Sequence, residues 1–182
     1  MQNSKYDPRE FEDCVIPNGK KLAIIIPFRD DGSNIRKNHL KVLLHYMIPI
    51  LIRQNVKFQF FVVTQVKRTV IHLINNDLNF FQTQNSIFNR GKLMNIGFAE
   101  ARKFNEFDCY FFHDVDLIIE NDEAIYHCRT NPLHYSGYIN KWNYKLPSDW
   151  IPYGGVTAFK PEAFQVRILI VNIFNLIITL RS

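Results

Sequence analysis

Hydrophobic and polar residues follow one another in blocks that predict alternating strands and helices. Residues 22–26 form a continuous apolar run closed by Pro27, a pattern typical of a strand buried on both faces of a parallel sheet. Apolar runs at residues 58–63 and 109–112 predict two further strands.

Two helices are predicted between these strands. Their inward positions recur at helical spacing: Ile35, Leu40, Leu43, Leu44, Met47 and Leu51 within residues 35–54, and Leu93, Ile96, Gly97 and Ala101 in a helix that begins at Asn89. Pro49 is expected to kink or end the first helix. The order strand, helix, strand, helix, strand predicts an α/β fold with a parallel sheet, whose ligands bind beyond the carboxyl ends of the strands.

Three segments lie outside this pattern. Residues 1–19 are polar and show no signal peptide or membrane anchor. Residues 66–86 are rich in Asn and Gln and stand where a short connection is usual. Residues 165–182 are apolar but shorter than the roughly 20 residues that a membrane span needs. This tail fits a last buried strand or helix, or an exposed aggregation-prone end. Residues 20–164 are therefore the expected folded region.

Composition and charge narrow the class of function. A chain of 182 residues suffices for one domain, and 16 Phe and 8 Tyr predict a buried core. The net charge of +5 comes from scattered Lys and Arg, so no nucleic-acid partner is expected, and an anionic small molecule such as a nucleotide fits equally well. Cys14, Cys109 and Cys128 are too few for a disulfide scaffold and lack zinc-site spacing.

The sharpest chemical signal is the sequence His113-Asp114-Val115-Asp116 directly after the third predicted strand. In an extended chain Asp114 and Asp116 point to the same side, and a cation between them would offset their repulsion. A hard divalent cation suits these carboxylates, with a diphosphate supplying its remaining oxygen ligands. The alternative is a solvated turn with two capping aspartates.

Two arginines are expected near Asp116. Arg29 follows the first strand, and Arg90 begins the second helix. Guanidinium groups and a helix N-terminus beside a metal-binding carboxylate indicate a nucleoside-diphosphate site. Each arginine taken alone is better explained as half of a surface ion pair.

The chain resembles the β-1,4-galactosyltransferase family in several blocks that occur in the family's order. They are residues 21–30 (KLAIIIPFRD), 88–98 (FNRGKLMNIGF), 112–118 (FHDVDLI) with 120–122 (END), 141–147 (KWNYKLP) and 154–159 (GGVTAF).

The resemblance implies an incomplete GT-A-type glycosyltransferase fold, a Rossmann-like parallel sheet, over residues 20–164, with residues 66–86 as an insert and 165–182 as a tail foreign to the family. It implies a hexosyltransferase that uses Mn²⁺ and transfers galactose, with inversion, from UDP-galactose to the 4-hydroxyl of a terminal GlcNAc-type acceptor of glycans. It also implies the lumenal side of the Golgi membrane, reached through an N-terminal anchor that this sequence does not show.

The family's site residues carry over by position. The expected donor-binding residues are Pro27, Phe28, Arg29, Asp30, Asp31, Phe88, Asn89, Arg90, Asp114, Val115 and Asp116. The resemblance makes Asp116 the Mn²⁺ ligand and places Trp142 and Tyr144 in the sugar-facing cleft; without the resemblance, packing is the usual role of such aromatic residues. It also implies a disulfide between Cys109 and Cys128, for which two buried free thiols are the alternative.

The chain departs from the family in ways that limit these expectations. After Phe164 the family continues to a Trp-Gly-Trp-Gly-Gly-Glu-Asp-Asp block with the acceptor contacts and the catalytic base, which this chain lacks. No catalytic residue is therefore assigned, and little or no transfer by this chain alone is expected. At residues 151–153 the spacing is one residue longer than in the family, which would leave room for UDP-GalNAc as donor.

Two other interpretations stay open. One is a non-catalytic fragment that binds UDP or a partner protein, and the other is an unfolded product with no role. Translated intron sequence, from a faulty gene model or a retained intron, is our hypothesis for residues 66–86 and 165–182.

Overall fold

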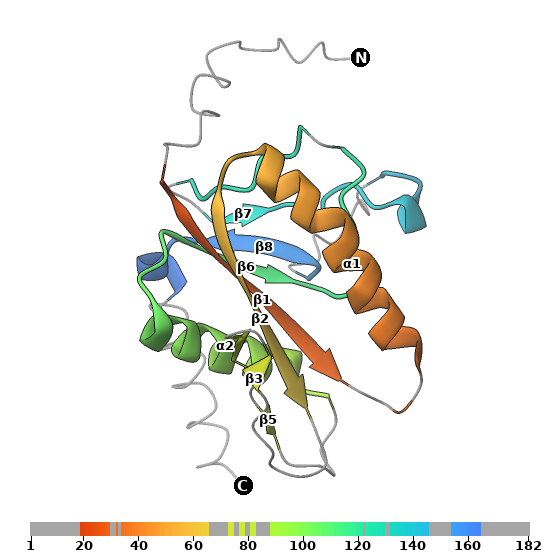
Figure 1. Ribbon diagram of the computed structural model, residues 1–182. Coiled ribbons are helices and arrows are strands. Elements are labelled where there is room, and N and C mark those ends of the chain that lie inside the picture. The colour runs from red at the N-terminus through yellow and green to blue at the C-terminus, as the bar shows by residue number, and fades with distance from the viewer. Residues whose placement is uncertain are drawn as a thin grey trace, which may run out of the picture.

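The computed structural model describes seven parts of the chain: residues 19–29, 32, 34–65, 88–121, 123–129, 132–145 and 154–164. It also describes the backbone of three two-residue strands between residues 73 and 82 (Figure 1). Predictions that concern residues 1–18, Asp30, Asp31, residues 146–153 or residues 165–182 lie outside the described residues.

Within the described chain, one six-stranded sheet has the order β5-β2-β1-β6-β8-β7 (Figure 1). The bounds are β1 (Lys21–Arg29), β2 (Lys57–Gln65), β5 (Phe81–Gln82), β6 (Cys109–His113), β7 (Leu133–His134) and β8 (Val156–Phe159). Strands β5, β2, β1 and β6 run parallel, which confirms the predicted α/β fold with parallel strands. Beyond β6 the sheet is antiparallel, because β8 runs against both β6 and β7. The three predicted strands are thus parallel to one another, and β7 and β8 are antiparallel strands that the sequence pattern did not predict.

The predicted insert is not separate from the sheet. Within residues 66–86, β5 pairs in parallel with the end of β2 through Thr64 and Gln65. Strands β3 (Leu73–Ile74) and β4 (Asp77–Leu78) form a small antiparallel sheet of their own. The described part of this stretch thus extends the sheet on the side away from β6.

Strand β1 is apolar from Leu22 to Phe28 because both of its faces are covered. Its even-numbered residues from Leu22 to Phe28 belong to a core with helix α1 (Asn34–Arg53), whereas Ala23 and Ile25 belong to a second core with helix α2 (Arg90–Phe104). Alternate side chains of a strand point to opposite faces, so the two helices cover opposite faces of the sheet (Figure 1). The strand also continues past Pro27, which lies beyond the last pair with β6 and pairs only with β2.

Helix α1 differs from its prediction in two respects. It does not end at Pro49 but continues to Arg53, because the next two residues, Ile50 and Leu51, are buried; Leu51 packs in the core with β1. Burying two such side chains contributes about 3–6 kcal/mol, which offsets the roughly 3 kcal/mol cost of an internal proline. Ile35, expected to face inward, is 62% exposed, so the first turn of α1 is not part of the core.

Helix α2 begins as predicted, since the side chain of Asn89 accepts a hydrogen bond from the backbone N–H of Lys92 and so caps the helix. Gly97 faces the sheet so closely that a Cβ atom there would lie 2.5 Å from Ile25 Cγ2 and 2.8 Å from Val63 Cγ2. A glycine is therefore required at this contact. No helix in the described residues is long and apolar enough to cross a membrane.

Candidate functional site

The parallel strands β1 and β6 end at the same side of the molecule, which we call the rim. Their register runs from Leu22 opposite Cys109 to Ile25 opposite Phe112, so the end of β1 and the loop after β6 lie at the same level. Arg29, the exposed last residue of β1, and Asp114 and Asp116 after β6 are therefore all placed at the rim, as the sequence predicted for a parallel sheet.

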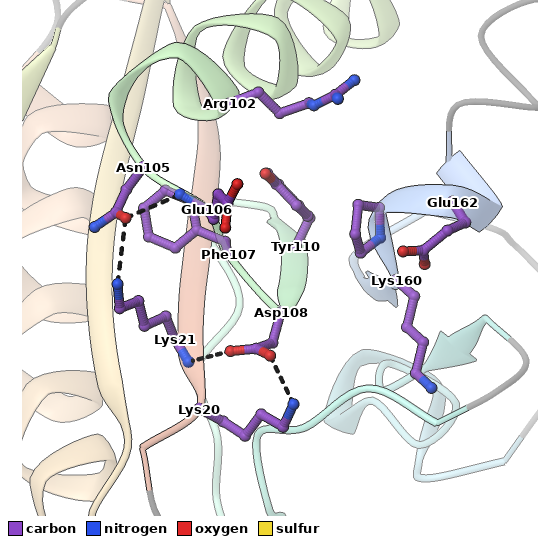
Figure 2. Close-up of a pocket in the computed structure, with 11 residues that line it drawn as sticks. Lys20, Lys21, Arg102, Asn105, Glu106, Phe107, Asp108, Tyr110, Lys160 and Glu162 are labelled. Atoms are coloured by element: carbon purple, nitrogen blue, oxygen red, sulfur yellow. Dashed lines mark hydrogen bonds and ion pairs between the residues drawn. The ribbon is translucent and has the colours of Figure 1, made fainter.

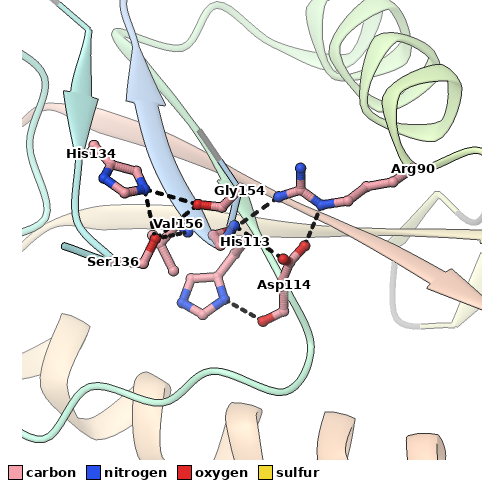
Figure 3. Close-up of polar contacts among 8 residues, drawn as sticks. Arg90, His113, Asp114, His134, Ser136, Gly154 and Val156 are labelled. Atoms are coloured by element: carbon pink, nitrogen blue, oxygen red, sulfur yellow. Dashed lines mark hydrogen bonds and ion pairs between the residues drawn. The ribbon is translucent and has the colours of Figure 1, made fainter. Parts of the chain in front are cut away.

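Arg90 closes a small network at the rim (Figure 3). Its Nε donates to Asp114 Oδ1 at 2.5 Å, and its Nη2 donates to the Gly155 carbonyl at 3.2 Å. The backbone N–H of Gly155 donates to Asp114 Oδ2 at 3.1 Å, and that of Asp114 donates back to the Gly155 carbonyl at 3.1 Å. This network joins the N-terminus of α2, the loop after β6 and the start of β8.

The ion pair sits in a partly desolvated place. The side chains of Arg90 and Asp114 are 31% and 26% exposed. Burial raises the pKa of the Asp114 carboxyl above its ordinary value, although the Arg90 guanidinium acts in the opposite direction. A carboxylate and a guanidinium that are held together and half open to solvent can bind hydroxyl groups from a ligand.

Asp114 and Asp116 do not lie on an extended strand. Strand β6 ends at His113, and the N–H of Leu117 bonds the Asp114 carbonyl at 3.4 Å, which closes a turn over residues 114–117. The premise of an extended chain was therefore wrong. Asp114 is the partner of Arg90, whereas Asp116 is exposed at the third position of the turn.

Gly155 opposes this turn from β8 and is fixed by its surroundings. Its φ of +84° favours glycine, and a Cβ atom there would lie 2.2 Å from Ser136 Oγ and 2.9 Å from Leu117 Cδ1. The buried Ser136 hydroxyl accepts from the Val156 N–H at 3.0 Å, and its Oγ is also 2.9 Å from the Gly154 carbonyl and from His134 Nε2 (Figure 3).

His113 was not singled out from the sequence. The last residue of β6 is fully buried, and both ring nitrogens have partners: Nδ1 lies 2.8 Å from the Asp114 carbonyl and Nε2 lies 3.1 Å from the Tyr126 hydroxyl. Burial lowers the pKa of His113 to about 4, so the ring is neutral near pH 7. Its position immediately before the two aspartates was the only signal in the sequence.

A cavity of about 420 Å³ opens beside Asp116, lined on its inner side by His113 and Tyr126. Its outer side includes Glu120 and Tyr144, whose hydroxyl donates to Glu120 Oε2 at 2.7 Å. Tyr144 follows the short helix η2 (Asn140–Trp142). The cavity therefore combines two exposed carboxylates, Asp116 and Glu120, with tyrosine rings, groups that suit a sugar or a nucleoside.

The other expected donor-binding residues are distributed unevenly. Phe28 and Val115 are 6% and 4% exposed and pack in the core on the α1 side, so their side chains serve packing. Pro27 is buried and Phe88 is half-buried. Asn89 is exposed, and its side-chain oxygen already accepts the hydrogen bond that caps α2. The structure thus brings Arg90 and Asp114 into contact and leaves Arg29 and Asp116 exposed at the same rim.

The oxygen chemistry of Asp116 suits a hard divalent cation such as Mn²⁺ as one ligand. Among the described residues no group of three or more His, Cys, Asp and Glu side chains could hold a metal ion. A cation bound here would therefore take its other oxygens from a diphosphate or from water.

Cys109 and Cys128 form a disulfide with Cα atoms 5.5 Å apart, the pairing that the family resemblance implied. It ties the first residue of β6 to the end of the loop that carries Asp116. Tyr135 supports the same loop end, since its hydroxyl lies 2.8 Å from the Ile125 carbonyl and 2.9 Å from the His127 carbonyl.

At the opposite end of the sheet lies a larger, open cavity of about 1000 Å³ (Figure 2). Asp108 accepts from Lys20 Nζ at 2.6 Å and from the Lys21 N–H at 2.9 Å, so it connects the start of β1 with the start of β6. Burial alone would raise the pKa of Asp108, but the bonds from the two lysines outweigh it and hold the pKa below its ordinary value. We interpret this arrangement as structural.

Comparison with known proteins decides the family. Residues 1–129 match the family described as the N-terminal region of glycosyl transferase group 7. Human β-1,4-galactosyltransferase 1 is 39% identical over 161 residues, which cover 88% of this chain and 33% of the relative. The chain belongs to the β-1,4-galactosyltransferase family. It spans about a third of the length of the curated relatives it matches.

Other members of the β-1,4-galactosyltransferase family give the same result. Pig β-1,4-galactosyltransferase 5 is 42% identical over 153 residues, 84% of this chain and 33% of that protein. A β-N-acetyl-D-glucosaminide β-1,4-N-acetylglucosaminyl-transferase from Lymnaea stagnalis is 38% identical over 148 residues, 81% of this chain and 26% of that protein.

A solved structure supports the fold. A mutant of Drosophila β-1,4-galactosyltransferase 7 in complex with manganese, UDP-Gal and xylobiose superposes with a TM-score of 0.57 at 28% identity, over 80% of this chain and 51% of that one. The matched relatives thus include a manganese-bound enzyme.

Proposed function

We propose that this chain provides the donor-binding part of a Mn²⁺-dependent β-1,4-galactosyltransferase. The full reaction would pass galactose or GalNAc, with inversion, from a UDP-sugar to a terminal GlcNAc-type acceptor of glycans. The observation that carries the proposal is the rim itself, where an exposed Asp116 on a tight turn stands beside the Arg90–Asp114–Gly155 network. The Drosophila relative, bound to manganese and UDP-Gal, supports the choice of ligand.

Each polar residue of the rim has a distinct proposed role. Asp116 would hold the cation and, through it, the diphosphate, while the exposed guanidinium of Arg29 would attract the nucleotide phosphates. Arg90 and Asp114, half-buried and already paired, would orient hydroxyl groups of the sugar. When bound, Mn²⁺ would act as a Lewis acid that neutralises charge on the UDP leaving group.

Neither Asp114 nor Glu120, the carboxylates next to Asp116 at the site, is assigned as the base that an inverting transfer requires. Asp114 is paired with Arg90, and Glu120 accepts a bond from Tyr144. We therefore expect the 182-residue chain to bind a UDP-sugar but to transfer it slowly or not at all.

Calorimetric titration of the purified chain with UDP, in Mn²⁺ and again in EDTA, tests donor binding. We expect Mn²⁺-dependent binding that Asp116→Asn weakens about tenfold or more. Glu120→Gln, a neighbouring exposed carboxylate outside the turn, is the matched control and should change affinity less than threefold. Equal binding by wild type and Asp116→Asn would contradict the proposal.

The donor sugar is best decided by comparison. UDP-galactose, UDP-GalNAc and UDP-GlcNAc should be titrated in parallel, since one relative is named as an N-acetylglucosaminyl-transferase. A preference for UDP-GlcNAc would contradict the galactose or GalNAc assignment.

A second candidate function is a non-catalytic fragment that binds UDP or a partner protein. It is favoured by the existing partners of Asp114 and Glu120, neither of which is assigned as a catalytic base. A Mn²⁺ transfer assay with a terminal-GlcNAc acceptor separates the two candidates, because turnover above the blank excludes a purely binding role.

We further propose the Golgi lumen as the place of action. The disulfide between Cys109 and Cys128 supports an oxidising compartment. Thiol counting on protein from secreting cells should find this pair oxidised.

A further inference from the structure

One buried side chain bonds the carbonyl that closes the turn presenting Asp116. The Asp114 carbonyl that closes the turn with the Leu117 N–H is also the partner of His113 Nδ1, at 2.8 Å. The 3.4 Å bond within the turn is long, so the shorter imidazole bond is the stronger restraint on this carbonyl.

The partners of His113 fix which ring nitrogen carries the proton. A peptide carbonyl can only accept, so Nδ1 must be the N–H that donates to Asp114. Nε2 then has a lone pair, which accepts from the Tyr126 hydroxyl at 3.1 Å. The ring is fully buried, and its neutral form satisfies both bonds without a charge in the core.

Tyr126 is itself held in place. Its backbone N–H donates to Gln54 Oε1 at 2.9 Å, just after the end of α1, and its ring stacks on Phe111 of β6 with centroids 4.5 Å apart. Burial raises the pKa of the Tyr126 hydroxyl, which therefore remains a donor at every pH at which the protein is folded. A chain of contacts thus runs from α1 through Tyr126 and His113 to the turn.

We propose that His113 is the positioning residue of the Asp116 turn and that its Nδ1–H bond to the Asp114 carbonyl sets the affinity of the rim for Mn²⁺ with UDP. This inference rests on the proposed function. His113 does not contact the ligand; it holds the backbone so that the Asp116 carboxylate is already placed when the cation arrives. Groups that orient a metal ligand from behind typically change metal affinity 10- to 100-fold when removed.

Three variants of the full chain separate positioning from packing. His113→Phe keeps a ring in the core but removes both nitrogens, whereas His113→Asn places an amide N–H close to the position of Nδ1. Tyr126→Phe removes the donor to Nε2, and Tyr110→Phe, which removes another buried hydroxyl on the opposite face of the sheet, is its matched control.

The readouts are the Mn²⁺ dissociation constant at saturating UDP, from the electron paramagnetic resonance signal of free Mn²⁺, and the urea unfolding curve. We expect about tenfold or weaker Mn²⁺ binding in His113→Phe, recovery to within about threefold of wild type in His113→Asn, and no change in Tyr110→Phe. Tyr126→Phe should weaken binding about twofold to threefold.

The outcomes are distinguishable. If wild type shows no Mn²⁺-dependent UDP binding, the proposed function fails and the positioning role with it. If wild type binds but folded His113→Phe binds equally well, or His113→Asn gives no recovery, only the positioning role is overturned. Should His113→Phe not fold, ¹⁵N spectra of the histidines in wild type decide between the outcomes. A proton on Nε2 of His113 instead of Nδ1 overturns the inference. A proton on Nδ1, together with weaker Mn²⁺ binding by Tyr126→Phe, supports it.

Discussion

Two aspartates flank strand β6, and each holds a basic side chain, yet their surroundings shift their pKa values in opposite directions. Asp108, before the strand, is 38% exposed and its pKa is lowered. Asp114, after the strand, is 26% exposed and its pKa is raised, even with Arg90 at 2.5 Å. Burial raises the pKa of both carboxyls. At Asp108 the bonds and charges of Lys20 and Lys21 outweigh it, whereas at Asp114 burial, together with the Asp116 charge, outweighs Arg90.

This contrast separates a structural end of the sheet from the end where we propose the binding site. Folding makes ionisation of Asp108 more favourable than in the unfolded chain, as expected of a group that fastens two strand starts together. Folding makes ionisation of Asp114, at the rim, less favourable than in the unfolded chain.

The largest expected effect comes from adding a side chain at Gly155, whose backbone bonds Asp114. Gly155→Ala would place a methyl group at φ +84° and 2.2 Å from Ser136 Oγ, so the free energy of unfolding should fall by about 4 kcal/mol. Gly154→Ala is the control, because nothing lies within 4 Å of a Cβ there. Urea unfolding measures both, and equal effects would show that the rim backbone is not constrained as described.

Next in size is the disulfide that links the start of β6 to the end of the loop after it. The disulfide joins residues 19 apart in sequence, and replacing Cys109 and Cys128 by Ala together should cost about 3 kcal/mol of unfolding free energy. Dithiothreitol should lower the unfolding midpoint of wild type and leave that of the double variant unchanged. A wild type insensitive to the reductant would mean that the bond does not form in solution.

Asp114→Ala should lower the free energy of unfolding by less, about 2 kcal/mol. It leaves the Gly155 N–H and the half-buried Arg90 without their carboxylate partner. Asp114→Asn retains a polar side chain at this site and should recover part of the loss. Thermal and urea unfolding check the ranking, and an Ala variant as stable as wild type would argue against the network.

The smallest effect is the pH dependence that distinguishes the two aspartates. Because the pKa of Asp108 is lowered, its contribution is present above the ordinary value of 3.8 and is lost as pH falls through the folded-state pKa. The pKa of Asp114 is raised, so its contribution is present below 3.8 and is lost as pH rises through the folded-state pKa.

Stability of wild type relative to Asp108→Asn should therefore decline toward acid pH, by about 0.5 kcal/mol for so exposed a pair. Relative to Asp114→Asn it should decline from pH 3.8 upward. Urea unfolding between pH 3 and pH 7 gives both slopes, and slopes of the same sign would refute the contrast.

Sequence patterns predicted the centre of this fold well because local and global preferences agree there. Residues 22–26 are apolar on both sides of the strand since a helix covers each face, and Asn89 caps α2 through its own side chain. The helix end predicted at Pro49 and the inward position predicted for Ile35 are wrong for the same reason. Helical spacing alone does not specify which turns of the helix are buried in the fold: Ile50 and Leu51 are buried, whereas Ile35 is exposed.

At the site, the types of residue could be predicted from the sequence, but not which side chains bond each other. Arg90 was expected to serve a phosphate, yet in the structure it is paired with Asp114. No role was predicted for His113, because its two hydrogen-bond partners are the Tyr126 hydroxyl, 13 residues away, and a backbone carbonyl, which no side-chain pattern reveals.

The close contact of Gly97 with Ile25 and Val63 has an evolutionary consequence. Helix α2 carries Arg90 at its first position, so its distance from the sheet also fixes how far that guanidinium reaches toward the loop after β6. A homologous chain that acquires a side chain at the place of Gly97 should therefore change Ile25 or Val63 to a smaller residue in the same lineage, and these three positions should mutate together rather than singly.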